Sequence, residues 1–167
     1  MVKKSSNQGL PGLDLSKTAR NGRFLRSCLA IPLLFILCPI LRAEIIDLRG
    51  IAQVESSGRA DAIGDKHLKN HAYGLYQIRK PLLIDFNHST KSSFTERDML
   101  NASKASKVAN WAFSSYYPRI LKAKGHKPSR IALLTCWNMG QGSFFLGKRA
   151  SDYESKYLKA LNNINKK

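Results

Sequence analysis

Apolar residues recur mostly at helical spacing along this chain, and the pattern predicts a domain built mainly from helices. In residues 44–54 apolar side chains return every three or four positions, which predicts a helix with one face against a core. This helix is expected to end at residues 55–58, Glu-Ser-Ser-Gly, because Ser and Gly favour termination. Residues 59–71 are polar and contain the turn-forming pair Gly64-Asp65, so we expect a loop or a small hairpin there.

The middle of the chain predicts one short helix and one long helix. The semi-apolar segment 73–78 leads into a short helix near residues 81–86. Thr95, with an acid three residues later, is typical of a helix start. A long helix is then expected over residues 101–117, with Pro118 near its end because proline does not continue the hydrogen-bond ladder.

The last third of the chain predicts two further helices. Ser129 is expected to cap an apolar helix over residues 130–137, which stops at a turn over residues 138–142. Ser151 and Glu154 have the spacing of a capping box for a final helix. The predicted fold class is therefore mostly α, with a small irregular or hairpin segment between the first two helices.

The first 43 residues differ from the rest and are predicted to form an N-terminal hydrophobic export segment. Residues 1–26 contain six basic residues and one acid, and residues 28–41 form an uncharged apolar run. A run of this length is short for a membrane span and suits the apolar core of a signal peptide. Ala43 fits the position before a cleavage site, but Leu41 is larger than a signal peptidase prefers.

A cleaved signal peptide and an uncleaved single membrane anchor therefore both stay open for residues 1–43, with a buried helix of a cytosolic protein as a third possibility. We expect a chain exported across the cytoplasmic membrane to the periplasm or cell envelope, either secreted or anchored. Residues 44–167 are expected to form the functional domain.

The chain is strongly basic, with 28 Lys and Arg residues against 11 Asp and Glu residues and a net charge of +17. Residues 1–43 hold seven of the basic residues and one of the acidic ones, so residues 44–167 keep a net charge of +11. Such a balance implies an anionic partner: nucleic acid, acidic lipid or the bacterial envelope. The basic residues are not arranged in a stripe with aromatic residues, so we expect no nucleic-acid binding.

Glu55 is the first candidate for chemistry because it closes an apolar helix. A carboxyl at the edge of a core is desolvated, which raises its pKa and keeps it protonated near neutral pH. A protonated carboxyl can donate its proton to the oxygen of a glycosidic bond as that oxygen leaves. Helical spacing alone nevertheless fits a solvated glutamate at a helix end better than a catalytic acid.

Three short motifs favour the interpretation of Glu55 as a catalytic acid. They are Glu-Ser-Ser-Gly at residues 55–58, Gly-Leu-Tyr-Gln-Ile at residues 74–78 and Trp-Asn-Met-Gly-Gln-Gly at residues 137–142. In this order, with helices between them, they resemble the three motifs of the soluble-lytic-transglycosylase-like (SLT) family of the lysozyme-like superfamily. The resemblance covers about residues 45–161 and implies a lysozyme-like domain that acts on the glycan strands of bacterial peptidoglycan.

The resemblance also implies roles for individual residues. Glu55 matches the family's single catalytic acid, and the small residue beside it is thought to help hold the site. The residues expected to bind substrate are Ser56, Gly74, Tyr76, Gln77, Trp137 and Asn138. The chain departs from the family at Tyr76, Cys136 and Trp137, where Met, Ala and Tyr are more usual. Aromatic residues close to the motifs, expected to stack on sugar faces, are Tyr73, Tyr76, Trp137 and Phe144.

The implied reaction is lytic transglycosylation, with Glu55 as acid and then as base. It cleaves the β-1,4 bond between N-acetylmuramic acid (MurNAc) and N-acetylglucosamine (GlcNAc) and leaves a 1,6-anhydro-muramic acid end, without water, metal or other cofactor. A hydrolytic lysozyme on the same fold would ordinarily need a second carboxylate. Asp61 and Asp65 are the candidates for it, with turn formation as the simpler interpretation of both.

The sequence also fits other classes of protein and contains residues typical of other kinds of site. A non-catalytic cell-wall-binding envelope protein and a cationic membrane-active protein both remain open, and the chain is expected to be a monomer. His67 and His71 lie four apart but have no third ligand at a suitable spacing, so no metal site is expected. Cys136 lies in an apolar helix and is expected to be a buried, inert thiol.

Overall fold

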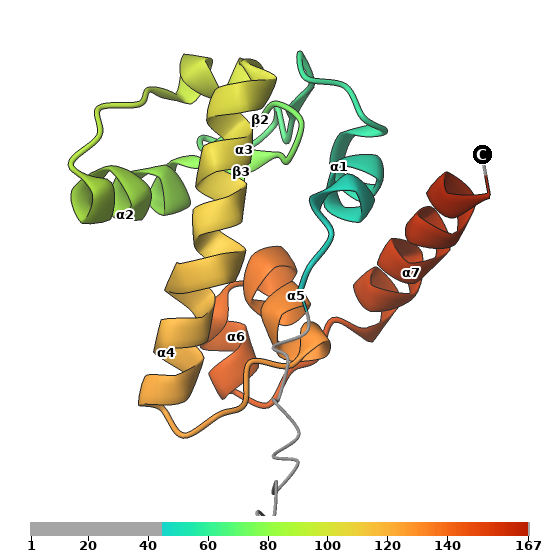
Figure 1. The fold of residues 1–167 in the computed structure, drawn as a ribbon. Coiled ribbons are helices and arrows are strands. Elements are labelled where there is room, and N and C mark those ends of the chain that lie inside the picture. Colours follow the sequence, from blue (N-terminus) through green and yellow to red (C-terminus); the bar gives the residue numbers. More distant parts are fainter. Residues whose placement is uncertain (1–44, 167) are drawn as a thin grey trace, which may run out of the picture. The chain divides into compact units, whose positions relative to one another are not determined.

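The computed structural model describes residues 45–166, which form helices around a small three-stranded sheet (Figure 1). The predicted export segment, residues 1–43, lies outside the described residues. Among the residues that are described, no helix combines the length and the apolar character needed to cross a membrane.

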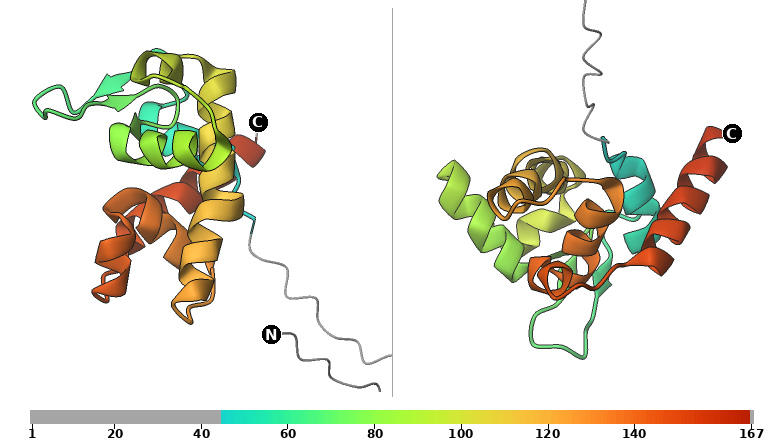
Figure 2. Two further views of the ribbon diagram at one scale, coloured as in Figure 1. Left: turned by 90° about the vertical axis from the view of Figure 1, so that its left-hand side faces the viewer. Right: turned by 90° about the horizontal axis from the view of Figure 1, so that it is seen from below.

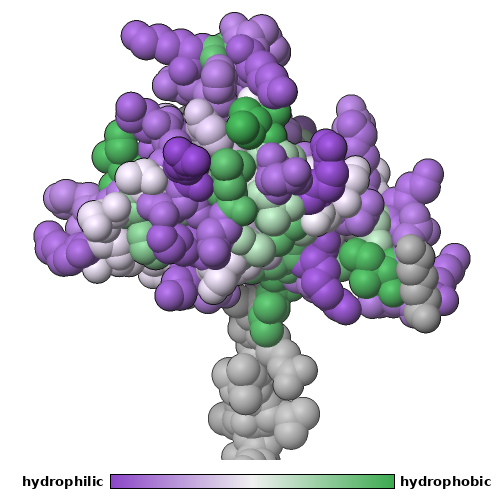
Figure 3. Space-filling view, turned by 90° about the horizontal axis from the view of Figure 1, so that it is seen from above, coloured by the Kyte–Doolittle hydropathy of each residue, from purple (hydrophilic) through white to green (hydrophobic). Residues whose placement is uncertain are grey.

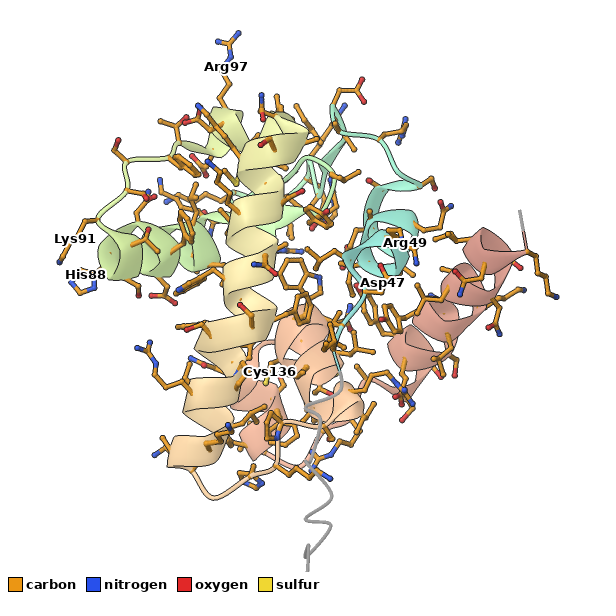
Figure 4. All side chains as sticks on the ribbon, viewed as in Figure 1. Asp47, Arg49, His88, Lys91, Arg97 and Cys136 are labelled. Carbon is orange, nitrogen blue, oxygen red and sulfur yellow. The ribbon has the colours of Figure 1, made fainter. Side chains whose placement is uncertain are left out.

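Helix α1 (Leu48–Ser56) carries the first motif at its C-terminal end. It begins at Asp47, whose carboxylate accepts a 2.9 Å hydrogen bond from the Arg49 N–H and so satisfies one free donor of the first turn. Figure 4 shows Asp47 and Arg49 side by side at this helix start. The predicted helix is confirmed, and Glu55 lies in its last turn, just before Ser57 turns into the left-handed conformation.

The segment between the first two helices is the expected hairpin, extended by a third strand. Strands β1 (Ile63–Gly64), β2 (Ala72–Tyr73) and β3 (Ile78–Arg79) pair antiparallel in that order. The loop between β1 and β2 projects from the body of helices in both panels of Figure 2. The short sheet therefore brings the second motif, which lies between β2 and β3, next to the end of α1.

Helix α2 (Lys80–Thr90) follows β3 directly and contains the predicted short helix. A 3₁₀-helix, η1 (Glu96–Leu100), comes next and has the predicted cap. The Thr95 hydroxyl accepts from the Asp98 N–H, and the Asp98 carboxylate accepts from the Thr95 N–H at 2.7 Å. The structure thus confirms the start signal at Thr95, although the helix it begins is a separate single turn.

The long central helix passes Pro118 instead of ending near it, so that expectation was wrong. Helix α3 (Ala102–Trp111) runs into a π-turn, η2 (Ala112–Tyr116), and then into helix α4 (Tyr117–Ala123), as one column in Figure 1. The π-turn is wider than an α-turn and directly precedes the proline. Pro118 therefore occupies the first turn of α4, where its missing N–H costs little.

Helix α5 (Arg130–Met139) and helix α6 (Gln141–Phe145) carry the third motif. Gly140, at φ 82°, separates the two helices. The predicted turn over residues 138–142 is therefore wrong except at Gly140, because residues 138–139 belong to α5 and residues 141–142 belong to α6. A glycine in the left-handed region is enough to break the helix for one residue without a longer loop.

Helix α7 (Ser151–Asn165) closes the chain, but the capping box expected at its start is absent. Ala150 is the N-cap, and its N–H donates to the buried Thr135 hydroxyl at 3.0 Å. The Glu154 carboxylate instead accepts a 2.8 Å hydrogen bond from the Arg130 guanidinium. Tertiary contacts with α5 thus replace the local cap.

The core is continuous from α1 through the long central helix to α7. Its fully buried larger side chains include Ile51, Ile78, Met99, Val108, Leu121, Leu134 and Tyr157. Figure 3 shows that the face seen from above is mainly hydrophilic, with hydrophobic residues in small areas. The burial follows the predicted apolar periodicity and leaves the motif residues at the meeting point of the sheet, α1, α2 and α5.

Candidate active site

A cavity of about 690 Å³ opens where the small sheet and α2 face the central helix, α5 and α6. Its polar lining comprises Glu55, Asp65, Gln77, Arg79, Asp85, Tyr116, Asn138 and Gln141. The first, second and third motifs each contribute to this lining. Residues more than 80 positions apart in the sequence therefore meet in one cavity, as the ordered motifs predicted.

Glu55 is held at this cavity through one of its two carboxyl oxygens. The Trp137 indole N–H donates a 2.8 Å hydrogen bond to Oε1, and the Tyr153 hydroxyl donates a 2.6 Å hydrogen bond to the same atom. No described residue hydrogen-bonds Oε2. The second oxygen is thus the one on which a transferable proton can sit.

The surroundings of Glu55 raise its pKa above the ordinary value of 4.5. Burial is the largest cause, because it disfavours the charged carboxylate. The hydrogen bonds from Tyr153 and Trp137 and the positive charge of Arg79 oppose the rise, and the negative charge of Asp65 adds to it. The net result favours a protonated carboxyl, the form that a general acid requires.

Ser56, Gly74 and Tyr76 lie behind the cavity and do not line it. Ser56 is 5% exposed, and its hydroxyl donates to the Leu75 carbonyl at 2.9 Å, which ties the end of α1 to the second motif. Tyr76 is also 5% exposed, and its hydroxyl lies 3.1 Å from the Ser106 hydroxyl. Three of the six predicted substrate-binding residues therefore lie outside the lining, and Ser56 and Tyr76 support the wall of the site.

Gly74 is required by its surroundings. Its φ is +74°, and a Cβ at this position would lie 1.7 Å from the Met99 carbonyl oxygen. Any side chain would push η1 away from the turn between β2 and β3. The glycine of the second motif thus lets the turn pack closely on η1, and this packing positions Gln77.

Gln77 lines the cavity in a left-handed backbone conformation, with φ at 50°. Its amide Nε2 donates to the Gly74 carbonyl at 2.9 Å and to the Ala62 carbonyl at 3.3 Å. The side chain packs so closely on β1 that a Cβ at Gly64 would lie 2.1 Å from Gln77 Oε1. Both donor bonds of the amide are thus made to the protein, and the side chain ties the turn of the second motif to the start of the hairpin.

Trp137 and Asn138, from the end of α5, also line the cavity. The Trp137 ring stacks on Phe113, with ring centroids 4.9 Å apart. This stacking fixes the indole so that its N–H points at Glu55. Of the aromatic residues expected near the sugar, Trp137 reaches the cavity lining, whereas Tyr73 and the buried Phe144 do not.

Tyr153 was not predicted from the sequence, although it touches the central carboxyl. It lies on α7, one helical turn before Tyr157, whose hydroxyl accepts a 2.9 Å hydrogen bond from the Asp47 N–H. The two tyrosines therefore hold both ends of α1. Their four-residue spacing is a sequence signal for one helical face, and it could have marked this pair.

Charged residues of β3, α2 and the hairpin complete the lining. Arg79 pairs with Asp65, while the Tyr116 hydroxyl donates to the Asp85 carboxylate. Burial and the Asp85 contact raise the pKa of Tyr116 to about 12. Of the two acids proposed as a second carboxylate, Asp65 lies in the cavity, and the exposed Asp61 lies outside its lining.

Cys136 on α5 is buried, as predicted, although it also borders the cavity, and Figure 4 places it inside the helical body. Burial raises the pKa of its thiol to about 11, so the reactive thiolate is disfavoured at neutral pH. His67 and His71 lie on the hairpin loop. Within residues 45–166, no three His, Cys, Asp or Glu residues are grouped as metal ligands would be.

The family model described as the transglycosylase SLT domain matches residues 46–160, more than half of the chain. The chain therefore belongs to this family, which degrades the glycan strands of peptidoglycan by lytic transglycosylase-type activity. The search of curated proteins gave no match, and the search of solved structures gave none either.

Proposed function

We propose that this protein is a peptidoglycan lytic transglycosylase that cleaves the MurNAc–GlcNAc β-1,4 bond and forms 1,6-anhydro-muramic acid ends. The observation that carries the proposal is the state of Glu55. Its pKa is raised by burial, Oε1 is occupied by two donors, and Oε2 is left for the substrate. A carboxyl arranged in this way is suited to give up one proton in a fixed direction.

In the proposed first step, Glu55 Oε2 donates its proton to the glycosidic oxygen as the bond from that oxygen to the muramic acid C1 breaks. Positive charge develops at C1, and the N-acetyl group of the substrate stabilises it. The Glu55 carboxylate formed in this step is stabilised by the donors Trp137 and Tyr153 and by the positive charge of Arg79.

In the second step, the carboxylate removes the proton from the muramic acid O6 hydroxyl. That oxygen forms a bond to C1 and closes the 1,6-anhydro ring. The proton lost by Glu55 in the first step is thereby regained, and no water is consumed. One carboxyl group, whose pKa burial raises, performs both transfers.

A hydrolytic lysozyme is the second candidate, and the position of Asp65 is the observation in its favour. Asp65 lines the same cavity and its charge acts on Glu55. Its carboxylate is, however, paired with Arg79, which reduces its ability to activate water or to attack C1. We therefore favour the lyase, for which Asp65 serves to hold Arg79.

The proposed location follows from the substrate, because peptidoglycan lies outside the cytoplasmic membrane. Residues 1–43 would then act as a signal peptide or as a single membrane anchor. The protein would work as a monomer in the periplasm or cell envelope. This location is tested by adding protease to cells whose layers outside the cytoplasmic membrane have been removed. An exported protein is expected to be digested. Protection of the protein until the cytoplasmic membrane is also permeabilised would contradict the location.

The activity is tested by digesting purified peptidoglycan sacculi and measuring the masses of the soluble products. The wild type is expected to release fragments that end in anhydro-muramic acid, and Glu55→Gln is expected to release none. Fragments with reducing muramic acid ends would favour the lysozyme. If sacculi bind the protein without release of fragments, the chain is a wall-binding protein instead.

A further inference from the structure

Helix α6 joins the cavity to a second feature at the opposite end of the helix. Gln141 begins α6 in the cavity lining, and Phe145 ends it next to the loop between α4 and α5. The His126 ring in that loop lies 5.2 Å from the Phe144 ring and 5.6 Å from the Phe145 ring. In Figure 1, α4 and α6 both end at the lower side of the domain. Residues 122–127 and 144–149 are called the helical tip below.

The apex of the helical tip is apolar and open to solvent. Leu146 is 81% exposed, and its neighbour Phe145 is 37% exposed. Phe144, behind them, is buried and anchors the loop to the domain. Two adjacent large apolar side chains held outward on an anchored loop are a feature of surfaces that meet an apolar partner.

Cations surround this apolar apex. The exposed basic residues of the helical tip are Lys122, Lys124, Lys127, Lys148 and Arg149. Arg149 is held in place, since its guanidinium lies 4.3 Å from the Phe144 ring centroid. The sequence has no acid between Asp98 and Asp152, although that stretch holds nine Lys and Arg residues. Residues 122–127 and 144–149 themselves contain no acidic residue, and the nearest one in the sequence is Asp152.

We propose that the helical tip docks on the surface of an anionic phospholipid membrane. Exposed apolar side chains that enter the boundary between headgroups and acyl chains, with Lys and Arg beside them, are the combination that such a surface binds. A soluble polyanion would be bound by the cations alone and would give no role to Leu146. The chemistry of the tip therefore favours lipid.

Docking at the tip would hold the cavity close to the membrane. Helix α6 spans five residues, or about 7 Å at the helical rise, between Gln141 and the apex. If the proposed function is correct, the enzyme would cut glycan strands next to the membrane. The docking itself does not depend on that function.

The docking is tested with the full chain and vesicles that contain phosphatidylglycerol in a phosphatidylcholine background. Leu146→Trp places a fluorophore at the apex, and Leu158→Trp places a control fluorophore on α7, where Leu158 is 37% exposed against 81% for Leu146. Bromine on the acyl chains quenches tryptophan fluorescence. In vesicles with brominated lipid, the fluorescence of the tryptophan at position 146 is expected to be at least about twofold lower than in unbrominated vesicles, and that of the tryptophan at position 158 is expected to be unchanged. Equal quenching at the two positions, or no vesicle binding, would overturn the proposal.

The cations are tested by a second pair of variants with equal loss of charge. Replacing Lys124, Lys127 and Lys148 by Gln is expected to weaken vesicle partitioning by about 100-fold, since each lysine at an anionic surface contributes about fivefold. The control replaces Lys69, Lys156 and Lys159 by Gln and is expected to cost less than about tenfold. Equal losses would overturn the proposal, because binding would then depend on net charge alone.

A third comparison separates lipid from a polyanion. Leu146→Ser is expected to weaken vesicle binding, and soluble polyphosphate is expected to compete poorly with the wild type. If Leu146→Ser binds vesicles as the wild type does and polyphosphate displaces both, the tip binds a polyanion and the membrane proposal is wrong. Vesicles contain no glycan, so these results and the muropeptide result can fail separately.

Discussion

The Tyr153 hydroxyl donates a 2.6 Å hydrogen bond to Oε1 of Glu55, although the two residues lie 98 positions apart in the sequence. Together with the Trp137 N–H, this donor occupies one oxygen of the carboxyl and leaves the other for a substrate. The last helix of the domain thus reaches the residue on which the proposed chemistry depends. Burial and, after it, contact with Glu55 raise the pKa of Tyr153 itself, so this phenol remains a donor at neutral pH.

Tyr153→Phe is expected to raise the pKa of Glu55 further, because it removes a hydrogen bond that stabilises the carboxylate form. The alkaline limb of the pH–activity profile should therefore move to higher pH. Hydrogen bonds to charged groups contribute about 1.5–3 kcal/mol, so the rate should fall by roughly 10- to 100-fold. The measurement is the pH dependence of soluble muropeptide release.

Tyr157→Phe is the matched control for that variant. Tyr157 lies one turn further along α7 and accepts from the backbone N–H of Asp47 instead of contacting Glu55. Its loss should lower the free energy of unfolding by about 1 kcal/mol and leave the alkaline limb in place. A shift of that limb in both variants would mean that α7 acts on Glu55 through packing and not through the Tyr153 hydroxyl.

Glu55→Gln is expected to stabilise the fold at neutral pH while it abolishes activity. The glutamine oxygen can accept both hydrogen bonds that Oε1 accepts, and it carries no charge to bury. Because the folded pKa of Glu55 lies above 4.5, the wild type loses stability as pH rises from about 4.5 through the folded pKa. Denaturant unfolding at pH 4 should give nearly equal free energies, and at pH 8 the variant should be more stable. A variant that is less stable at pH 8 would contradict the raised pKa.

Gly74→Ala is expected to lower the free energy of unfolding by about 2–4 kcal/mol, because the new Cβ would lie 1.7 Å from the Met99 carbonyl oxygen. Gly58→Ala is the control. It has a similar positive φ of +80°, and no atom lies within 4 Å of the added Cβ, so it should cost about 1–2 kcal/mol. Equal losses in chemical denaturation would show that backbone conformation, and not the contact with η1, accounts for the glycine.

Ser56→Ala tests whether Ser56 supports the site from behind. It leaves the part-buried Leu75 carbonyl without its 2.9 Å hydrogen bond, and should cost about 1–3 kcal/mol of unfolding free energy. Ser155→Ala removes a similar but exposed hydrogen bond and should change stability by less than about 0.5 kcal/mol. Substrate affinity should be nearly unchanged in folded Ser56→Ala. A large loss of affinity without loss of stability would place Ser56 in contact with substrate.

Local patterns in the sequence predicted the elements well where each element is governed by its own residues. The apolar spacing before Glu55 and the Thr95–Asp98 cap both have structural counterparts. The predictions failed where a distant contact decides the local structure. Ala150 begins α7 because its N–H meets the Thr135 hydroxyl, and the wide turn before Pro118 lets the central helix continue.

In the site, too, residues that belong to local motifs could be predicted, and a residue placed by a distant contact could not. Glu55, Gln77, Trp137 and Asn138 were identified from their motifs and lie together at the cavity. Tyr153 lies in no motif that was recognised, and its role depends on how α7 packs against α1. Such packing is a property of the folded chain, because it joins helices from opposite ends of the domain.

The central claim, that Glu55 directs the muramic acid O6 and not water to C1, is tested most directly by digesting sacculi in ¹⁸O-labelled water. The account predicts that wild-type protein releases fragments one water lighter than hydrolysis products and without incorporated ¹⁸O. The Glu55→Gln variant should release none. Fragments that carry one ¹⁸O atom at a reducing muramic acid end would contradict the account and identify a hydrolase.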